Sequence, residues 1–504
     1  MEPLLTISQS PSSRTMITVW MVAVALGALL ALIPLETLAL LAGAALALVL
    51  ALAHPVLAVG MAVLSVPVQE LVVLPGGLSV TQAAVLLTLG VWVLHTLARA
   101  EQRMLPADLL LLWGGLLFAL LLSASITPYS RTEALRETSR WVVAAVVWMV
   151  AASTITRRWH VIYLLACLLL APAVCAGIGI VQFAVGDGPP SFRIAPDLPY
   201  VRAYGTIGQP NSFAGYLNMA WPLAFALAMV STGSAWRSRG QHRLTIVSRW
   251  ILAIILWSIT GVVLLALLAS FSRGAWIGAA IGALGMALGL GRRALPVFLG
   301  LAATGAAVAL LAITGILPEA LIVRLASIGR SMAWFDATAI TVTPENFAVV
   351  ERMAHLQAGW EMFRAAPLFG VGTGNYAVVY PEFAVGAWYA SRGHAHNYYL
   401  HMAAEAGIVG LLAYLALIGG MIRQTAHALR RTIDPVLYSA AIGGCGIIAA
   451  VAGHNLFENL HVLNFGIQLA GIWAVIGAIA HHTEDIQPRC AILSRVERGS
   501  LAVT

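Results

Sequence analysis

The sequence predicts an all-α polytopic membrane protein with about 12–14 transmembrane helices and one long outward-facing loop that contains short helices. Composition is the first observation: 60% of the residues are hydrophobic, 10% are charged and the mean hydropathy is +0.88. Apolar runs of about 20 residues recur from end to end, and this length crosses a bilayer. The runs do not alternate with a period of two, so helices rather than a closed barrel must satisfy the backbone in lipid.

Each candidate span is an apolar run bounded by polar residues or by Gly and Pro. In chain order the runs cover 17–35, 37–54, 56–75, 80–98, 106–124, 140–156, 160–183, 212–231, 249–270, 273–290, 295–315, 401–422, 436–454 and 461–481. Almost no polar residue separates the first three runs, and the third contains Pro67 and ends at Glu70. The count therefore falls between 12 and 14.

The arginines predict the orientation. All 28 basic residues are arginine, and most lie in short loops that the span order places on one side of the membrane. Such a bias marks the cytoplasmic side, although Arg131, Arg136 and Arg140 fall on the other side. We therefore expect cytoplasmic tails at 1–16 and 483–504 and a transmembrane domain at 17–482.

Two outward-facing segments, 186–211 and about 316–399, are too long to be simple turns. The second carries five arginines against six acids, and loops of this length are often lids or binding loops. Within it, Glu351–Arg364 reads as an amphipathic helix. Its expected apolar face consists of Met353, Leu356, Gln357, Trp360 and Phe363.

Two motifs place an arginine next to a predicted span. VRAYGTIGQPNSFAGY carries Arg202 and, after a Gly/Pro turn, Asn211, which could simply cap the next helix while Arg202 contacts headgroups. FSRGAWIG carries Arg273 between two apolar runs. A buried arginine in lipid costs roughly 2.5–3.5 kcal/mol, so we expect Arg273 to face the bundle interior, with snorkelling to the headgroups as the alternative.

Two further motifs belong to the long segment. PLFGVGTGNY, residues 367–376, reads as a structural turn that could shape a substrate groove. SRGHAHNYYLHMAAEAGIVG, residues 391–410, brings His396 and Asn397 to the start of a helix, followed by Glu405. Small residues on one face of that helix would admit a neighbouring helix, whereas the plainest alternative is that His396 and Asn397 only cap it. His454 and Glu458, in the last outer turn, are weaker candidates for chemistry.

Arginines, a histidine and a carboxylate at one membrane face suit transfer of a group from a lipid-linked diphosphate. Arginine binds phosphate through a planar fork, and a histidine can deprotonate an acceptor hydroxyl. The expected substrate-binding residues are Arg202, Arg273, Asn211, Asn397 and Glu405, with His396 as the catalytic residue. No Cys-x-x-Cys pair or His/Asp cluster predicts a metal site, no cofactor is expected, and no basic stripe interleaved with aromatics predicts nucleic-acid binding.

At these residues the chain resembles the O-antigen ligase and O-antigen polymerase superfamily, over about residues 200–470. His396 and Asn397 are followed by nine residues and then by Gly407 and Gly410, which matches the family's last outer-loop motif. FSRGAWIG is similar to its Ser-Arg-Gly motif, and RAYGTIGQPNSFAGY to its Gln/Asn-Pro-Asn turn. The resemblance implies a metal-independent membrane glycosyltransferase. His396 would then act as base or orient the acceptor, while Arg202 and Arg273, with Arg352 as a further candidate, would bind the diphosphate.

The resemblance leaves the acceptor open. The donor would be an undecaprenyl-diphosphate-linked glycan, and the acceptor a glycolipid, a growing glycan or a protein Ser or Thr, with membrane lipids as the surroundings. Ligation to a lipid core, polymerisation and protein O-glycosylation share one expected site. A transporter of lipid-linked glycans is the alternative outside the enzyme class; it predicts ionisable residues at mid-bilayer, whereas the polar groups here gather at the outer boundary.

Overall fold

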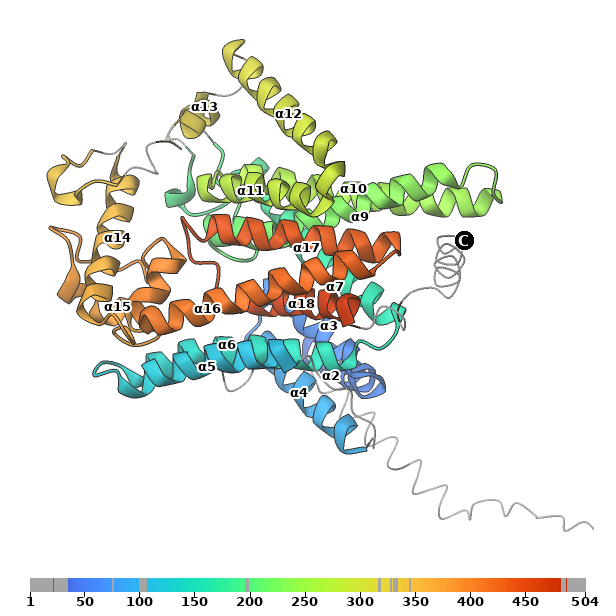
Figure 1. The fold of residues 1–504 in the computed structure, drawn as a ribbon, viewed down its shortest axis with the longest axis horizontal. Coiled ribbons are helices and arrows are strands. Elements are labelled where there is room, and N and C mark those ends of the chain that lie inside the picture. The colour runs from blue at the N-terminus through green and yellow to red at the C-terminus, as the bar shows by residue number, and fades with distance from the viewer. Residues whose placement is uncertain are drawn as a thin grey trace, which may run out of the picture. The chain divides into compact units, whose positions relative to one another are not determined.

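The structure is a computed structural model, and it describes residues 21, 35–74, 77–98, 107–194, 199–315, 319–326, 329, 334–343, 346–481 and 486 (Figure 1). Residues up to His54 form one unit, in which α2 (Leu35–Ala53) is an apolar helix. Pro55–Thr504 form the second unit, which holds every predicted site residue. The described residues of both units contain helices and connections but no strand longer than an isolated bridge.

Most helices of the second unit follow the predicted spans, with three differences. In chain order the helices are α3 (Pro55–Ser65), η1 (Val66–Val68), α4 (Val80–Ala98), α5 (Ala107–Ile126), α6 (Arg131–Thr154), α7 (Arg158–Val185), η2 (Pro190–Phe192), α8 (Pro210–Asn218), α9 (Trp221–Arg237), α10 (Arg243–Ala269), α11 (Arg273–Leu290), η3 (Gly291–Ala294) and α12 (Leu295–Ile313). After them come α13 (Glu319–Ala326), η5 (Ala337–Ala339), α14 (Phe347–Ala365), α15 (Tyr376–Val379), η6 (Tyr380–Phe383), α16 (Tyr398–Arg431), α17 (Pro435–His454) and α18 (Gly466–His481). The differences are that α6 begins nine residues before the predicted 140, the helix of the predicted run 56–75 ends by residue 68, and the predicted run 212–231 is divided between α8 and α9.

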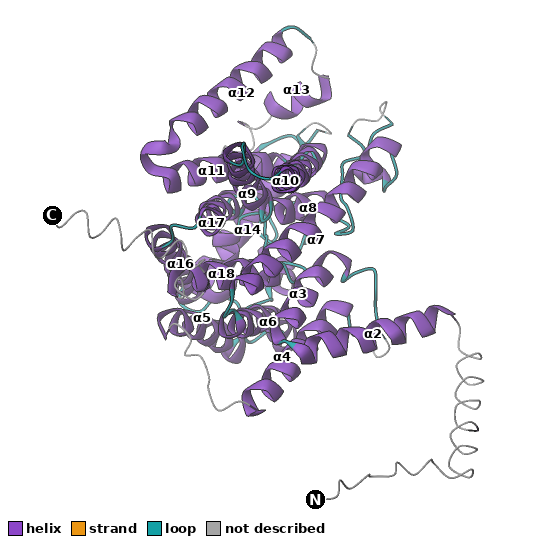
Figure 2. Ribbon diagram, turned by 90° about the vertical axis from the view of Figure 1, so that its right-hand side faces the viewer, coloured by secondary structure: helices purple, strands orange, loops and turns teal. Residues whose placement is uncertain are grey.

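Within the described ranges, eight helices are long and apolar enough to cross a membrane, and three shorter apolar helices accompany them. The all-α polytopic fold class is thereby confirmed. Most of the predicted run 17–35, the predicted tail 1–16 and all of the predicted tail 483–504 except Ile486 lie outside the described residues, so the total of 12–14 spans stays a prediction. Several helices of the second unit are seen nearly end on in Figure 2, with α18 packed against α6, α7 and α16.

The long segment after α12 contains short helices, as expected, but the predicted apolar face of α14 is wrong in part. Trp360 is exposed. Val350 and Ala354 are buried in a cluster with Ala337, whereas Ala358 and Met362 are buried in a cluster that includes Ala404 of α16. The sequence argument weighted large side chains. The structure instead uses small ones, because alanine lets two backbones approach closely.

Glycines spaced along α11 set its distance from α17, which leads into the site. A Cβ atom added to Gly274 would meet His454 and Phe457, and one added to Gly278 would meet the Ala450 carbonyl. Close helix approach through small residues replaces the hydrophobic driving force that lipid cannot supply. This packing fixes the end of α17 beside the start of α11, where Arg273 lies.

Helix α16 does not begin at His396 and is not straight. It begins at Tyr398, and it breaks at Gly407, which has φ 65°. A Cβ atom there would collide with the backbone of Leu368, so the expectation that Gly407 admits a neighbouring helix is wrong. The residue instead admits the loop before α15, whose carbonyls at Pro367 and Leu368 accept the N–H groups of Ile408 and Val409.

Candidate functional site

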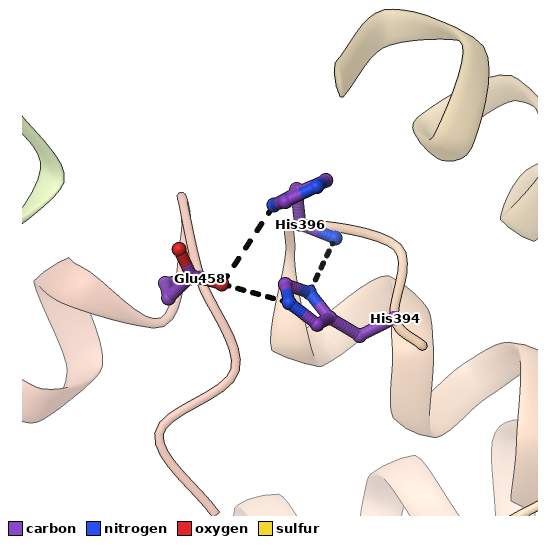
Figure 3. Close-up of side chains that lie close together, drawn as sticks. All are labelled: His394, His396 and Glu458. Carbon is purple, nitrogen blue, oxygen red and sulfur yellow. Dashed lines mark hydrogen bonds and ion pairs between the residues drawn. The ribbon is translucent and has the colours of Figure 1, made fainter. Parts of the chain in front are cut away.

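The centre of the site is a cluster of His394, His396 and Glu458 (Figure 3). His394 Nε2 lies 2.9 Å from Glu458 Oε1, and His396 Nδ1 lies 3.7 Å from the same oxygen. The two imidazole rings are 4.3 Å apart between centroids. The histidines come from the turn before α16 and the glutamate from the turn after α17, so the cluster joins two connections at one end of the bundle.

Local backbone chemistry explains the shape of the histidine turn. His394 Nδ1 accepts the backbone N–H of His396, at 3.1 Å, and His396 itself has φ 56°. Left-handed backbone at a residue other than glycine is strained, and such strain often accompanies function. Asn397 then caps α16, because its Oδ1 accepts the N–H of Leu400 at 3.0 Å. The capping interpretation of Asn397 is therefore confirmed, while His396 lies outside the helix.

Hydrogen bonds connect the cluster to Arg202 through Asn211. Glu458 Oε2 accepts from Asn211 Nδ2 at 2.8 Å, and Asn211 Oδ1 accepts from an Arg202 Nη2 at 2.7 Å. Arg202 Nε also donates to the carbonyl of Ser270, at 2.8 Å. Gln209 caps α8, so the interpretation of Asn211 as a helix cap is wrong. Asn211 is a buried bridge between an arginine and a carboxylate.

Four arginines gather around this chain of hydrogen bonds. Burial, and next the charges of Arg324 and Arg352, lower the pKa of Arg202 to about 9; Glu458 acts in the opposite direction and Arg273 adds to the lowering. Burial and Arg352 likewise lower the pKa of Arg324 to about 10. Such mutual repulsion makes the site favourable for an anion.

Arg273 is 6% exposed at the first position of α11, so the predicted burial is confirmed and the snorkelling alternative is wrong. Arg324, from α13, was not among the predicted residues. Its Nε donates to the carbonyl of Phe271, at 3.1 Å, which lies two residues before Arg273. Phe271 has φ 50°, a second strained backbone position at the site.

Burial and charge also set the protonation of the cluster. Burial first, then the charge of His394, lowers the pKa of His396 to about 3, against a smaller opposing effect of Glu458. Burial alone would raise the pKa of Glu458, but the two histidines outweigh it and hold that pKa well below its usual range. At neutral pH the cluster therefore pairs an uncharged His396 with a Glu458 carboxylate.

The loop that holds Glu458 is tied to the histidine turn through Asn455. The Asn455 carbonyl accepts the N–H of Tyr398 at 2.7 Å, while its Oδ1 accepts the N–H of Leu460 at 3.1 Å. Its Nδ2 donates to the hydroxyl of Tyr414, which also contacts His461 at 3.0 Å. One buried asparagine thus sets the register between the turns that carry Glu458 and His396.

Glu405 lies apart from the cluster. Its two carboxylate oxygens accept the backbone N–H groups of Gly374 and Tyr376, at 2.8 and 2.9 Å. The glycine-rich loop is thereby fastened to α16, and Gly374 has φ 73° with no room for a side chain beside Glu133. The structural-turn interpretation of residues 367–376 is confirmed, and Glu405 holds that turn in place.

The ligand atoms of His394, His396 and Glu458 lie within 4.8 Å of one another, close enough to hold a metal ion. The hydrogen bonds argue for a proton instead. Because His394 Nδ1 accepts a backbone N–H, the proton of a neutral His394 belongs on Nε2, the atom that faces Glu458. A metal at Nε2 would have to displace that proton, and the arginines nearby disfavour a further cation.

The fold and the site define a polytopic helical membrane protein with a buried, arginine-rich cluster at one end of its bundle. Residues 258–415 match the family described as O-Antigen ligase. This match supports the predicted membership of the O-antigen ligase and polymerase superfamily, and with it a membrane glycosyltransferase of that type. A search of curated proteins finds no match to the chain.

The matched segment contains Arg273, His396 and Glu405 but neither Arg202 nor Glu458. The structure brings Arg202, Arg273, Asn211 and His396 to one place, with Arg352 within electrostatic range. Sequence reasoning ranked Glu458 too low and omitted Arg324. The signal for Glu458 was its position in a short turn between two apolar runs, where a buried carboxylate needs polar partners.

Proposed function

We propose that the protein is a glycosyltransferase that moves a glycan from an undecaprenyl-diphosphate-linked donor to an acceptor hydroxyl at the outer face of the bacterial cytoplasmic membrane. The observation that carries the proposal is the uncharged His396 held against Glu458, a carboxylate that Asn211 links to Arg202 and so to the group of four arginines. A base beside an anion-binding group is what this transfer requires.

The arginines would bind the diphosphate. Arg202 donates from Nε to Ser270 and from Nη2 to Asn211, and the rest of its guanidinium group would bind the ligand. Guanidinium groups form paired, charge-assisted hydrogen bonds to phosphate oxygens. Binding of the anion would also relieve the repulsion that lowers the pKa of Arg202 and Arg324. The departing diphosphate, which gains negative charge, would be held more tightly than the intact donor.

His396 would take the proton. Its Nδ1 faces Glu458, so Nε2 is the nitrogen that would receive the proton of the acceptor hydroxyl. The hydroxyl oxygen forms a bond to the anomeric carbon of the glycan. The bond from that carbon to the diphosphate oxygen breaks, and its electron pair leaves with the diphosphate. Glu458 then stabilises the imidazolium, as a carboxylate does beside a catalytic histidine.

The test is transfer by the purified protein from a polyprenyl-diphosphate glycan, with a lipid-core glycolipid, a second glycan and a Ser/Thr-containing protein offered separately. A product with one acceptor that His396→Ala abolishes would support the proposal and identify the variant of the reaction. Movement of the donor across vesicles without any transfer product would favour the transporter and contradict it.

The orientation needs its own test. A cysteine introduced near Pro344, in the long segment, should react with an impermeant reagent in intact spheroplasts if that segment is outside the membrane. Cys167 and Cys175 are buried and give little background. Labelling that requires permeabilisation would place the site on the cytoplasmic side and reject a periplasmic reaction.

A further inference from the structure

A second polar site lies at the far end of the bundle from His396. A cavity of about 390 Å³ opens between the last turns of α16 and α18, lined by Arg423, Gln424, Ala426, His427, Arg430 and His481. The two helical segments of α16 that meet at Gly407 together rise on the order of 40 Å from Tyr398 to Arg423, which is about the thickness of a bilayer with its headgroups. The cavity therefore belongs to the opposite membrane face from the proposed transfer site.

The described lining of the cavity is mainly basic. The lining residues that the structure describes include two arginines and two histidines, whose rings lie 5.8 Å apart between centroids, and none of these described residues is a carboxylate. Gln424 is the second observation. It is 5% exposed, lies over Gly477 of α18, and neither its Nε2 nor its Oε1 has a hydrogen-bond partner in the described part of the chain. A buried amide without hydrogen-bond partners is destabilising, so a ligand that accepts and donates hydrogen bonds would be stabilised there.

We propose that this cavity binds the phosphate group of an anionic phospholipid headgroup. Arginine edges and the Gln424 amide supply donors for phosphate oxygens, and the Gln424 carbonyl can accept from a glycerol hydroxyl. Exposed apolar side chains continue along α16 from the cavity, with Ile422 53% exposed and Leu415 42% exposed. They offer the acyl chains a surface that a free phosphate ion would not need. Basic pockets between transmembrane helices recognise such headgroups.

Native mass spectrometry of the full-length protein in detergent tests the proposal, with phosphatidylglycerol and phosphatidylcholine of identical acyl chains as probes. The wild type should bind phosphatidylglycerol preferentially. Each arginine near a headgroup contributes about fivefold, so Arg423→Gln with Arg430→Gln should lower that preference by roughly 25-fold. The control is Arg237→Gln with Arg243→Gln, which removes the same charge from exposed positions that do not line the cavity.

Four outcomes would overturn the proposal. One is equal binding of the two lipids by the wild type. Another is an equal loss in the control, which would indicate bulk charge rather than a site. The third is displacement of phosphatidylglycerol by millimolar inorganic phosphate, which would make the ligand a free anion. The fourth concerns the chain's own carboxylates and uses the variant Glu484→Gln with Asp485→Asn. If this variant binds phosphatidylglycerol and the wild type does not, the ligand of the cavity is the chain's own carboxylates and not a lipid.

Discussion

Replacing Glu458 with glutamine is the sharpest perturbation of the proposed reaction, because it keeps the volume and removes the charge. Glu458 accepts from a histidine at Oε1 and from Asn211 at Oε2. A glutamine has only one acceptor oxygen, so its amide nitrogen must face either His394 Nε2 or Asn211 Nδ2. Rotating the Asn211 amide does not help, since its oxygen already accepts from Arg202. The substitution therefore leaves one donor facing another.

The magnitude follows from the distance between Glu458 and His396. An imidazolium at His396 Nδ1 would lie 3.7 Å from Oε1. At an effective dielectric constant of about 20, a charge pair at this distance is worth about 4 kcal/mol. That stabilisation exists only once the proton has moved, so its loss raises the barrier and lowers kcat by as much as about a thousandfold. Donor binding through the arginines should change little.

The assay is initial transfer rate against donor concentration for purified protein, beside its thermal stability. Glu458→Gln should lose kcat by about 10²–10³-fold with nearly unchanged KM for the donor. Glu382→Gln, at an exposed carboxylate of η6, is the control and should transfer normally. The double variant of Glu458→Gln with His396→Ala should be no slower than His396→Ala alone, because the two act as a unit. Fully additive losses would refute the pairing.

The remaining predictions concern the same site. His396→Ala should lower the transfer rate by about 10²–10⁴-fold in a folded protein. His394→Ala should lower it less, because His394 orients Glu458 and does not receive the proton. Near-normal turnover of His396→Ala would rule out His396 as the base. Arg202→Lys should raise the donor KM by roughly tenfold or more, since lysine cannot hold Ser270, Asn211 and a phosphate together, whereas exposed Arg193→Lys should not; unchanged KM would take Arg202 out of the site. Asn455→Ala should lower kcat more than it changes donor KM, because it frees the Glu458 loop and leaves the Leu460 N–H unpaired; a change confined to KM would contradict this positioning role. Because burial lowers the pKa of His396 to about 3, the folded state binds fewer protons than the unfolded one, whose histidine titrates near 6.5. The contribution of His396 to stability is present above pH 6.5 and is lost as the pH falls toward 3. The melting temperature should therefore fall less steeply below pH 6.5 in His396→Gln than in the wild type. Equal slopes would refute a lowered pKa for His396.

The sequence predicts the helices well and their detailed faces less well. Residues 160–183 and 273–290 are apolar apart from His160, Gln182 and Arg273, and α7 and α11 occupy them almost to the residue. Hydropathy suffices there because lipid imposes one requirement on every position. Trp360 shows the opposite case: on α14 a large side chain looks like core but is 44% exposed, since the neighbouring helix needs alanines for close approach.

The site was predictable where one motif carries the residue and unpredictable where two segments must meet. His396 and Arg273 stand in motifs with their own spacing. Glu458 follows His394 by 64 positions in the chain, and only the fold shows that the two lie 2.9 Å apart. Four-residue spacing of Gly274, Gly278 and Gly282 was visible in the sequence, but its consequence was not. These glycines bring α17 against α11 and so carry Glu458 toward Arg273.

The positive charges around His396 would affect two steps of the proposed reaction. Before the donor binds, burial and the charges of His394 and Arg352 keep His396 uncharged, and so able to accept a proton, over the physiological pH range. A base with so low a pKa would be weak, because proton transfer works best when the pKa is near the working pH. A diphosphate bound among the arginines would offset positive charge that opposes an imidazolium and would thereby raise the pKa of His396, while the larger effect of burial would remain. On the proposed mechanism the base would gain strength when the leaving group is in place, which would couple deprotonation of the acceptor to the presence of the donor.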